Sequence, residues 1–116
     1  MPVSRADRLA EEIKTQVAAI LPSLKNEQIK DRLVSVTRVE VSGDGKYARV
    51  FISVLGGEEE LKETVRALSS SAGFIRRELA ASLRTRHTPE LQFKEDAGIA
   101  RAGRTMEILK SLNGEK

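Results

Sequence analysis

The sequence predicts one α+β domain, in which helices cover one face of a small three-stranded sheet. Three features support this prediction: an amphipathic helical pattern near the start, two β-branched segments joined by a glycine-rich turn, and a longer amphipathic pattern that is interrupted in its middle. At 116 residues the chain is long enough for one domain with its own core, and no repeat or linker divides it. We therefore expect a single domain over residues 1–116, with its core between about residues 4 and 96.

A first helix is predicted over residues 4–21. Apolar residues recur there at steps of three and four, and Ser4 followed by Asp7 is typical of a capped helix start. Pro22 should end the regular helix, because proline lacks the backbone N–H and clashes with the preceding turn.

Two arginines, Arg5 and Arg8, fall in the first turns of this helix, where the helix dipole does not favour positive charge. A binding partner outside the helix would explain them. Ordinary solvated charge, paired with Glu12, would explain them equally well. Both interpretations stay open.

Two strands and a turn follow a polar stretch at residues 26–32. Residues 33–41 are rich in β-branched side chains, and residues 47–54 alternate apolar side chains with mixed ones. Residues 42–45, with the sequence Ser-Gly-Asp-Gly, supply a hairpin turn because glycine and aspartate tolerate positive φ. A short third strand is predicted at residues 91–94. The long connection that precedes it allows this strand to run parallel to a neighbour.

The longest amphipathic pattern runs through residues 58–88 and keeps one apolar stripe over residues 61–83. The acidic residues at its start favour a helix that begins close to Glu58. A last, weaker helix is predicted at about residues 104–112.

The segment Ser71-Ala72-Gly73 interrupts this pattern without shifting its register. Glycine costs on the order of 1 kcal/mol relative to alanine inside a helix, and the serines before it offer the backbone competing hydrogen bonds. We predict a helix kink at Gly73. The helix that follows should continue until Thr88, which precedes a proline.

Composition limits the possible functions. The chain has no cysteine, which excludes disulfides, thiol catalysis and thiolate metal sites and fits a reducing, cytoplasmic compartment. The longest uncharged apolar run, residues 17–21, is too short to cross a membrane. His87 is the only histidine, and no carboxylate pair or metal-ligand spacing accompanies it. We therefore expect no enzyme, no cofactor and no metal ion.

Positive charge is concentrated after the predicted kink. Residues 58–63 hold four glutamates, whereas residues 64–89 hold five arginines and one glutamate. Four of these arginines follow the kink, namely Arg76, Arg77, Arg84 and Arg86. Arginines and a helix N-terminus both suit phosphate, so these four, and then Arg5 and Arg8, are the predicted RNA contacts. The alternative is that arginines late in a helix complement its dipole and solvate an exposed face.

The sheet offers a different candidate surface. Tyr47, Arg49 and Phe51 share the mixed face of the second strand, which should meet water at least in part. Aromatic residues are few in the chain, which argues against base stacking on this sheet. The alternative function is therefore a protein-interaction or dimerisation domain that uses this face.

The order helix, strand, strand, helix, kink, helix, strand resembles the type II KH fold. Local segments are also similar to those of the bacterial ribosome-binding factor A family, namely Val39–Asp44, Ala48–Ser53, Gly73–Arg76 and Pro89–Phe93. The similarity extends roughly from Ser4 to Leu112, and separated motifs in the same order make it specific.

This resemblance implies a cytoplasmic, non-enzymatic assembly factor that binds the small ribosomal subunit and its rRNA. It further implies a role in late subunit maturation, including processing of the precursor rRNA near its 5′ end. In the family a small-x-Gly kink replaces the glycine-rich loop of ordinary KH domains, and Ser71-Ala72-Gly73 occupies that place. We expect a monomer with no small-molecule substrate and no membrane partner.

Overall fold

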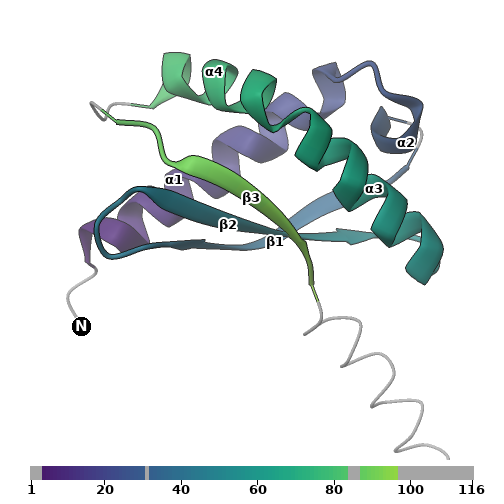
Figure 1. Ribbon diagram of the computed structural model, residues 1–116, viewed down its shortest axis with the longest axis horizontal. Coiled ribbons are helices and arrows are strands. Elements are labelled where there is room, and N and C mark those ends of the chain that lie inside the picture. Colours follow the sequence, from purple (N-terminus) through teal and green to yellow (C-terminus); the bar gives the residue numbers. More distant parts are fainter. Residues whose placement is uncertain (1–3, 31, 84–86, 97–116) are drawn as a thin grey trace, which may run out of the picture.

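Helices lie on one side of a three-stranded sheet in the computed structural model, which describes residues 4–30, 32–83 and 87–96 (Figure 1). In chain order the elements are α1 (Arg5–Ile20), the 3-10 turn η1 (Leu21–Ser23), α2 (Glu27–Lys30), β1 (Val34–Val41), β2 (Tyr47–Val54), α3 (Glu58–Ser70), α4 (Ala72–Ser82) and β3 (Glu90–Glu95). The predicted α+β class is confirmed. The helix predicted at about residues 104–112 lies outside the described residues.

The first helix begins and ends as predicted. The Oγ atom of Ser4 accepts a hydrogen bond from the backbone N–H of Asp7 at 3.0 Å, which satisfies one of the free donors at the start of α1. Pro22 lies in η1, where the chain leaves the regular helix.

The strands lie in the order β1-β2-β3, with β1 antiparallel and β3 parallel to β2. The turn between β1 and β2 is closed by a hydrogen bond of 2.9 Å from the N–H of Gly45 to the carbonyl of Ser42. Gly45 has a φ of 75°, a conformation that glycine adopts without strain. The chain reaches β3 through α3 and α4, and the predicted parallel pairing is confirmed.

The core lies between the sheet and the helices. Ala48, Val50 and Ile52 alternate along β2 and have no exposed surface. The helices contribute further side chains with no exposed surface, namely Ile13, Val17, Leu68, Ile75 and Leu79. Burial of one such aliphatic side chain is worth about 1.5–3 kcal/mol, so this shared core holds α1, α3 and α4 against one face of the sheet.

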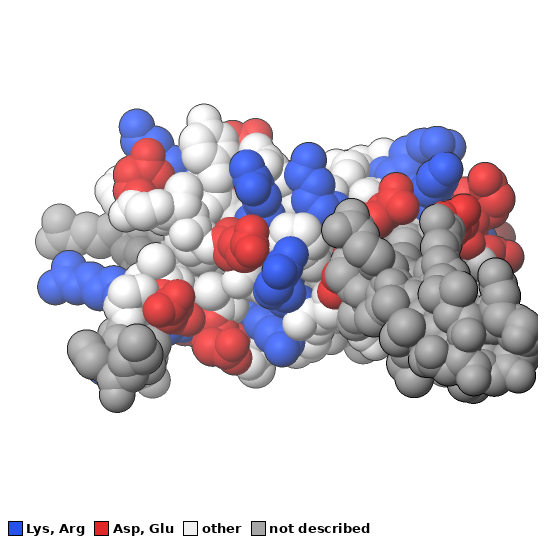
Figure 2. Space-filling view, turned by 90° about the horizontal axis from the view of Figure 1, so that it is seen from below, with Lys and Arg blue, Asp and Glu red and all other residues white. Residues whose placement is uncertain are grey.

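The opposite face of the sheet carries no helix among the described elements, and we call it the open face. Tyr47 and Arg49 are exposed on it, and Phe51 is half-buried. Figure 2 looks onto the molecule from below the view of Figure 1, and it shows basic and acidic side chains interspersed, with several basic ones near the middle.

The structure adds one element in the polar stretch that was predicted without a helix. Helix α2 is a single turn, and the Oδ1 atom of Asn26 accepts a hydrogen bond from the N–H of Gln28 at 2.8 Å at its start. Ile29, in the same turn, is only 2% exposed. Four residues carry too little periodicity to predict a helix, so the packing of Ile29 decides this one.

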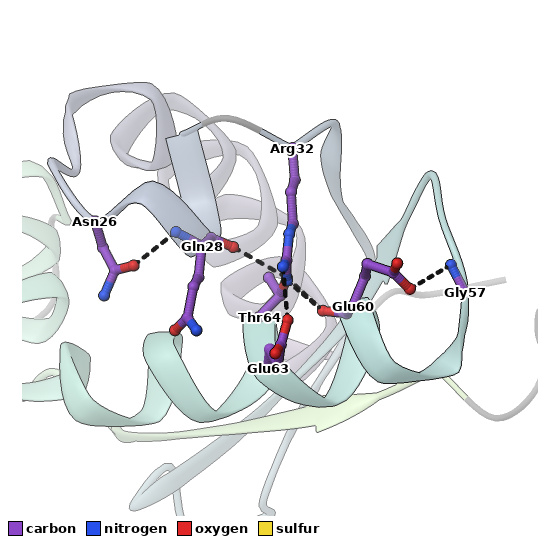
Figure 3. A network of polar contacts seen from close by, with 7 residues as sticks. All are labelled: Asn26, Gln28, Arg32, Gly57, Glu60, Glu63 and Thr64. Carbon is purple, nitrogen blue, oxygen red and sulfur yellow. Dashed lines mark hydrogen bonds and ion pairs between the residues drawn. The ribbon is translucent and has the colours of Figure 1, made fainter.

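Arg32 fastens the segment after α2 to the first turns of α3 (Figure 3). Its Nη1 atom donates to the Glu60 carbonyl at 2.8 Å and to the Thr64 hydroxyl at 3.0 Å, and its Nη2 atom lies 2.6 Å from Oε1 of Glu63. The Thr64 hydroxyl lies 3.1 Å from the Gln28 carbonyl and 2.7 Å from the Glu60 carbonyl, so it donates to one or the other. We call these five residues the Arg32 network, and its role is structural.

Candidate nucleic-acid interface

The two helices that follow β2 meet at Ser71. Its N–H donates to the carbonyls of Ala67 and Leu68 at 3.2 and 3.0 Å, which closes α3. Its carbonyl accepts a hydrogen bond from the N–H of Ile75 at 2.9 Å, which opens α4. The backbone of Ser71, with φ −97° and ψ 4°, departs from the helical conformation. The structure therefore places the break within the segment predicted to kink.

The exact site of the break differs from the prediction, which placed it at Gly73. Gly73 lies inside α4, two residues beyond the break, and a Cβ atom added there would meet no other heavy atom within 4 Å. Serine hydrogen bonding accompanies the break: the Ser70 hydroxyl donates to the Arg66 carbonyl at 3.1 Å, a back-bond of the kind that bends helices. The low helix propensity of one glycine was therefore the weaker of the two sequence signals.

Arg76 and Arg77 both lie on the exposed surface of α4, whose buried side carries Ile75 and Leu79. Arg76 also has a structural contact, because its Nε and Nη2 atoms donate to the carbonyl of Thr88 at 3.1 and 2.8 Å. This contact ties α4 to the segment that leads into β3. Part of the Arg76 guanidinium is thus engaged within the protein, which makes Arg77 the stronger candidate for a phosphate contact.

Helix α4 ends at Ser82, whereas the sequence predicted that it continues to Thr88. Leu83 has an extended backbone, with φ −81° and ψ 147°, and its side chain is 7% exposed. Six more helical residues would carry the chain about 9 Å further along the helix axis. The chain instead turns back towards the sheet, where Arg76 holds the Thr88 carbonyl.

The remaining predicted RNA contacts fall into two groups. Arg5 and Arg8 are exposed in the first turns of α1, which packs against α4. In Figure 1 α1 begins on the left, the side on which the β1–β2 turn lies and towards which α4 runs. Arg84 and Arg86 lie outside the described residues, so their role stays a prediction.

A hollow of about 440 Å³ lies beside Arg76, between the β1–β2 turn and the start of β3. Lys46, Arg76 and His87 line it, and so does Asp44. Hydrogen bonds from the Lys46 N–H and the Ser42 hydroxyl hold the pKa of Asp44 below its usual value, and this carboxylate shares the hollow with Lys46 and Arg76. Nothing in the sequence pattern indicated that Lys46 and Arg76 share a hollow, because the parallel placement of β3 brings them together.

No group of three or more histidine, aspartate and glutamate side chains in the described ranges is placed to hold a metal ion. Within the same ranges no helix is both long and apolar enough to span a bilayer.

A mixed three-stranded sheet with helices on one face, in this element order, defines a type II KH-like domain. The family model described as ribosome-binding factor A matches residues 5–109, and the chain belongs to that family. Ribosome-binding factor A is a non-enzymatic ribosome assembly factor, as the sequence resemblance implied.

Individual relatives agree with this assignment. Ribosome-binding factor A of Caldanaerobacter subterraneus subsp. tengcongensis is 42% identical over 113 residues, which cover 97% of this chain and 92% of the relative. The solution NMR structure of a Thermotoga maritima protein assigned to the family has a TM-score of 0.75 and 40% identity, with 84% of this chain and 92% of that chain covered.

A third relative bears on the binding partner. A homology model of ribosome binding factor A of Thermus thermophilus was fitted into the cryo-EM map of a 30S–RbfA complex. It has a TM-score of 0.62 and 27% identity with this chain, and the match covers 76% of this chain and 91% of that one.

Proposed function

We propose that this chain binds the small ribosomal subunit through its rRNA and assists late subunit assembly, including maturation of the precursor rRNA at its 5′ end. Family membership, together with the Thermus thermophilus relative placed in a 30S complex, is the observation that carries the proposal. The chain acts by binding, with no bond made or broken by its own side chains.

The exposed arginines of α1 and α4 support an RNA interface on the helical side of the molecule. Arg5 and Arg8 on α1 and Arg77 on α4 present guanidinium groups to solvent, and a guanidinium can bind phosphate through two parallel hydrogen bonds. The open space around Gly73 lets an RNA backbone approach the start of α4 closely. The break at Ser71 sets the direction of α4, and therefore where its arginines point.

Co-sedimentation with purified ribosomal particles tests the binding part of the proposal. The wild-type chain should pellet with free small subunits and not with large subunits. Binding should weaken steeply as the salt concentration rises, because phosphate contacts release counterions. Equal binding to both subunits, or none to the small one, would remove the proposed function.

A separate experiment tests the maturation part. Depletion of the protein in its host should lead to small subunits that retain precursor rRNA with an unprocessed 5′ end. Expression of the wild-type chain should restore the mature end, measured by primer extension. If the rRNA kept normal 5′ ends throughout depletion, the maturation role would be wrong, while the proposal of subunit binding would be unaffected.

A further inference from the structure

The open face of the sheet places three cations around one aromatic ring. The strand register sets Arg38 of β1 and Lys94 of β3 opposite Phe51 of β2, and Arg49 precedes Phe51 by two residues on the same strand face. The guanidinium carbon of Arg38 lies 4.1 Å from the centre of the Phe51 ring, which is a cation–π contact. We call Arg38, Arg49, Phe51 and Lys94 the cation–ring cluster.

Two adjoining hollows extend from this cluster along β2. One, of about 400 Å³, is lined by Arg49, Phe51, Gln92 and Lys94 together with an acidic residue at the end of β3. The other, of about 350 Å³, is lined by Tyr47, Arg49 and Gln92 together with the end of β1. Arg49 and Gln92 belong to both hollows, so the depression continues from Phe51 to Tyr47.

Acidic groups near the cluster leave it cationic. Glu40 lies 3.6 Å from Arg38, but the two side chains are 48% and 56% exposed, and such an exposed ion pair is worth little in water. Glu95 lines the larger hollow, and Glu40 lines the smaller one and pairs across the strands with Arg49. The two residues that pair directly across the strands with Phe51 are nevertheless both basic.

We propose that the open face binds single-stranded RNA. One base stacks on the outer face of the Arg38 guanidinium, which lies over the Phe51 ring, and Arg49 and Lys94 hold the neighbouring phosphates. The ligand must be both aromatic and anionic, because a ring with three basic neighbours suits a nucleotide. Arginine and aromatic residues also occur in protein–protein interfaces, but lysine is depleted there, so Lys94 beside the ring favours a nucleotide.

Two further residues extend this site. Tyr47 lies four residues before Phe51 on the same strand face, about 13 Å away at about 3.3 Å per residue, and offers a second ring. Gln92 lies between them on β3 and carries donors and an acceptor for a base edge. Aromatic residues are few in the chain, but the strand register concentrates Tyr47 and Phe51 on one face. The inference rests on the proposed function in one respect, since the RNA is taken to be that of the small subunit.

Tyr47 provides a direct probe, because it is the only tyrosine and the chain has no tryptophan. Its emission reports on one end of the open face, and because Tyr47 also lines the hollow beside Arg76, the variants below decide which surface holds the RNA. Titration with an oligoadenylate of about eight nucleotides should quench Tyr47 emission in a saturable manner, because bases stack on or near the ring. The same titration of free tyrosine amide corrects for light absorbed by the RNA.

Variants assign the binding to the cluster. The double variant Arg49→Gln and Lys94→Gln should bind the oligoadenylate about tenfold more weakly, and the slope of log K against log salt should fall by about 1.4 for two phosphate contacts. Phe51→Leu should weaken binding about fivefold or more. A matched control, Lys62→Gln with Arg66→Gln, removes two exposed charges from α3 and should bind as the wild type does. Circular-dichroism melts confirm that each variant is folded.

The outcomes separate the inference from the proposed function. No oligoadenylate binding by the wild type, unchanged Tyr47 emission at saturation, or equal affinity of the cluster and control variants would each overturn RNA binding on this face. Cluster variants that bind the oligoadenylate normally but no longer bind small subunits would show a protein contact instead. Failure of the wild type to bind small subunits would count against the proposed function, whatever the oligoadenylate does.

Discussion

Helices α3 and α4 follow one another directly and bury one common apolar side, yet they meet the rest of the molecule differently. The start of α3 is acidic and is fastened by the Arg32 network. Helix α4 presents Arg76 and Arg77 to solvent and is tied to the chain after it through the Thr88 carbonyl. The two helices therefore share one apolar stripe across the break at Ser71, although α3 is anchored through its acidic start and α4 presents arginines to solvent.

The shared core predicts the largest effect. Leu68 on α3 and Leu79 on α4 have no exposed surface, so Leu68→Ala and Leu79→Ala should each lower the free energy of unfolding by about 2–5 kcal/mol. Urea denaturation measures both. Leu55→Ala, at a site that is 77% exposed, is the control and should change stability by less than about 0.5 kcal/mol. If only one of the two substitutions lowered the free energy of unfolding by this amount, α3 and α4 would not share a core.

The anchoring of α3 predicts the next effect. Arg32→Ala removes the donors to the Glu60 carbonyl and the Thr64 hydroxyl and should lower stability by about 1–3 kcal/mol. Affinity for the small subunit should not change. Lys62→Ala, an exposed cation on the same helix, serves as the control. An Arg32→Ala protein of wild-type stability would mean that the network does not anchor α3.

The basic surface of α4 predicts an effect on binding. Arg77→Glu should lower affinity for the small subunit about tenfold, or about 1.4 kcal/mol, with nearly unchanged thermal unfolding because Arg77 is exposed. Arg76→Glu should lower both affinity and stability, since it also loses the hydrogen bonds to Thr88. Equal stability of the two variants would show that the Thr88 contact contributes nothing to the fold.

The position of the break predicts a smaller effect, of opposite sign. Gly73→Ala should raise stability by up to about 1 kcal/mol, because alanine is the better helix former and its Cβ meets no other atom. The break should persist, since Ser71 makes it. If urea denaturation showed that Gly73→Ala lowers stability, Gly73 and not Ser71 would be the cause of the break.

Acid conditions predict the smallest effect. The Glu60 carboxylate accepts hydrogen bonds from its own backbone N–H and from that of Gly57, and these lower its pKa. Hydrogen bonds from Lys46 and Ser42 lower the pKa of Asp44 in the same way. A lowered folded-state pKa means that this stability is complete above the ordinary values of 4.5 and 3.8 and is lost as pH falls through the folded-state pKa. Glu60→Gln and Asp44→Asn should therefore flatten the fall of the melting temperature between about pH 5 and about pH 2.5. If the variants lost melting temperature with falling pH as steeply as the wild type does, these two carboxylates would not contribute to the acid sensitivity.

Local patterns predicted those elements whose signal lies within a few residues. The cap at Ser4 and the glycine turn at Gly45 are of this kind, and the structure contains both. The end of α4 was missed because the sequence has no helix-breaking residue before Pro89, whereas the buried Leu83 and the hydrogen bonds to the Thr88 carbonyl end the helix earlier. The exact place of the break was missed because serine and glycine signals overlap there.

The candidate site divides in the same way. Exposed Arg5, Arg8 and Arg77 follow from their spacing relative to the apolar stripe, since helical periodicity alone sets which side faces solvent. The cation–ring cluster could not be found from spacing, because Arg38 and Lys94 belong to strands on either side of Phe51. Only strand pairing decides which of their positions lie opposite one another.

The amino-acid sequence by itself determined the order of the strands and the longer helices, without α2, and the single apolar stripe over α3 and α4, and it determined membership of the ribosome-binding factor A family. The elements and the stripe follow from local periodicity, and the family follows from the match of the sequence to the family model over residues 5–109. The tertiary structure alone decided that Arg76 donates hydrogen bonds to the Thr88 carbonyl. It alone also placed Arg38 and Lys94 beside Phe51. The physical reason is that such contacts depend on strand register and on where packing ends a helix, which short-range preferences do not specify.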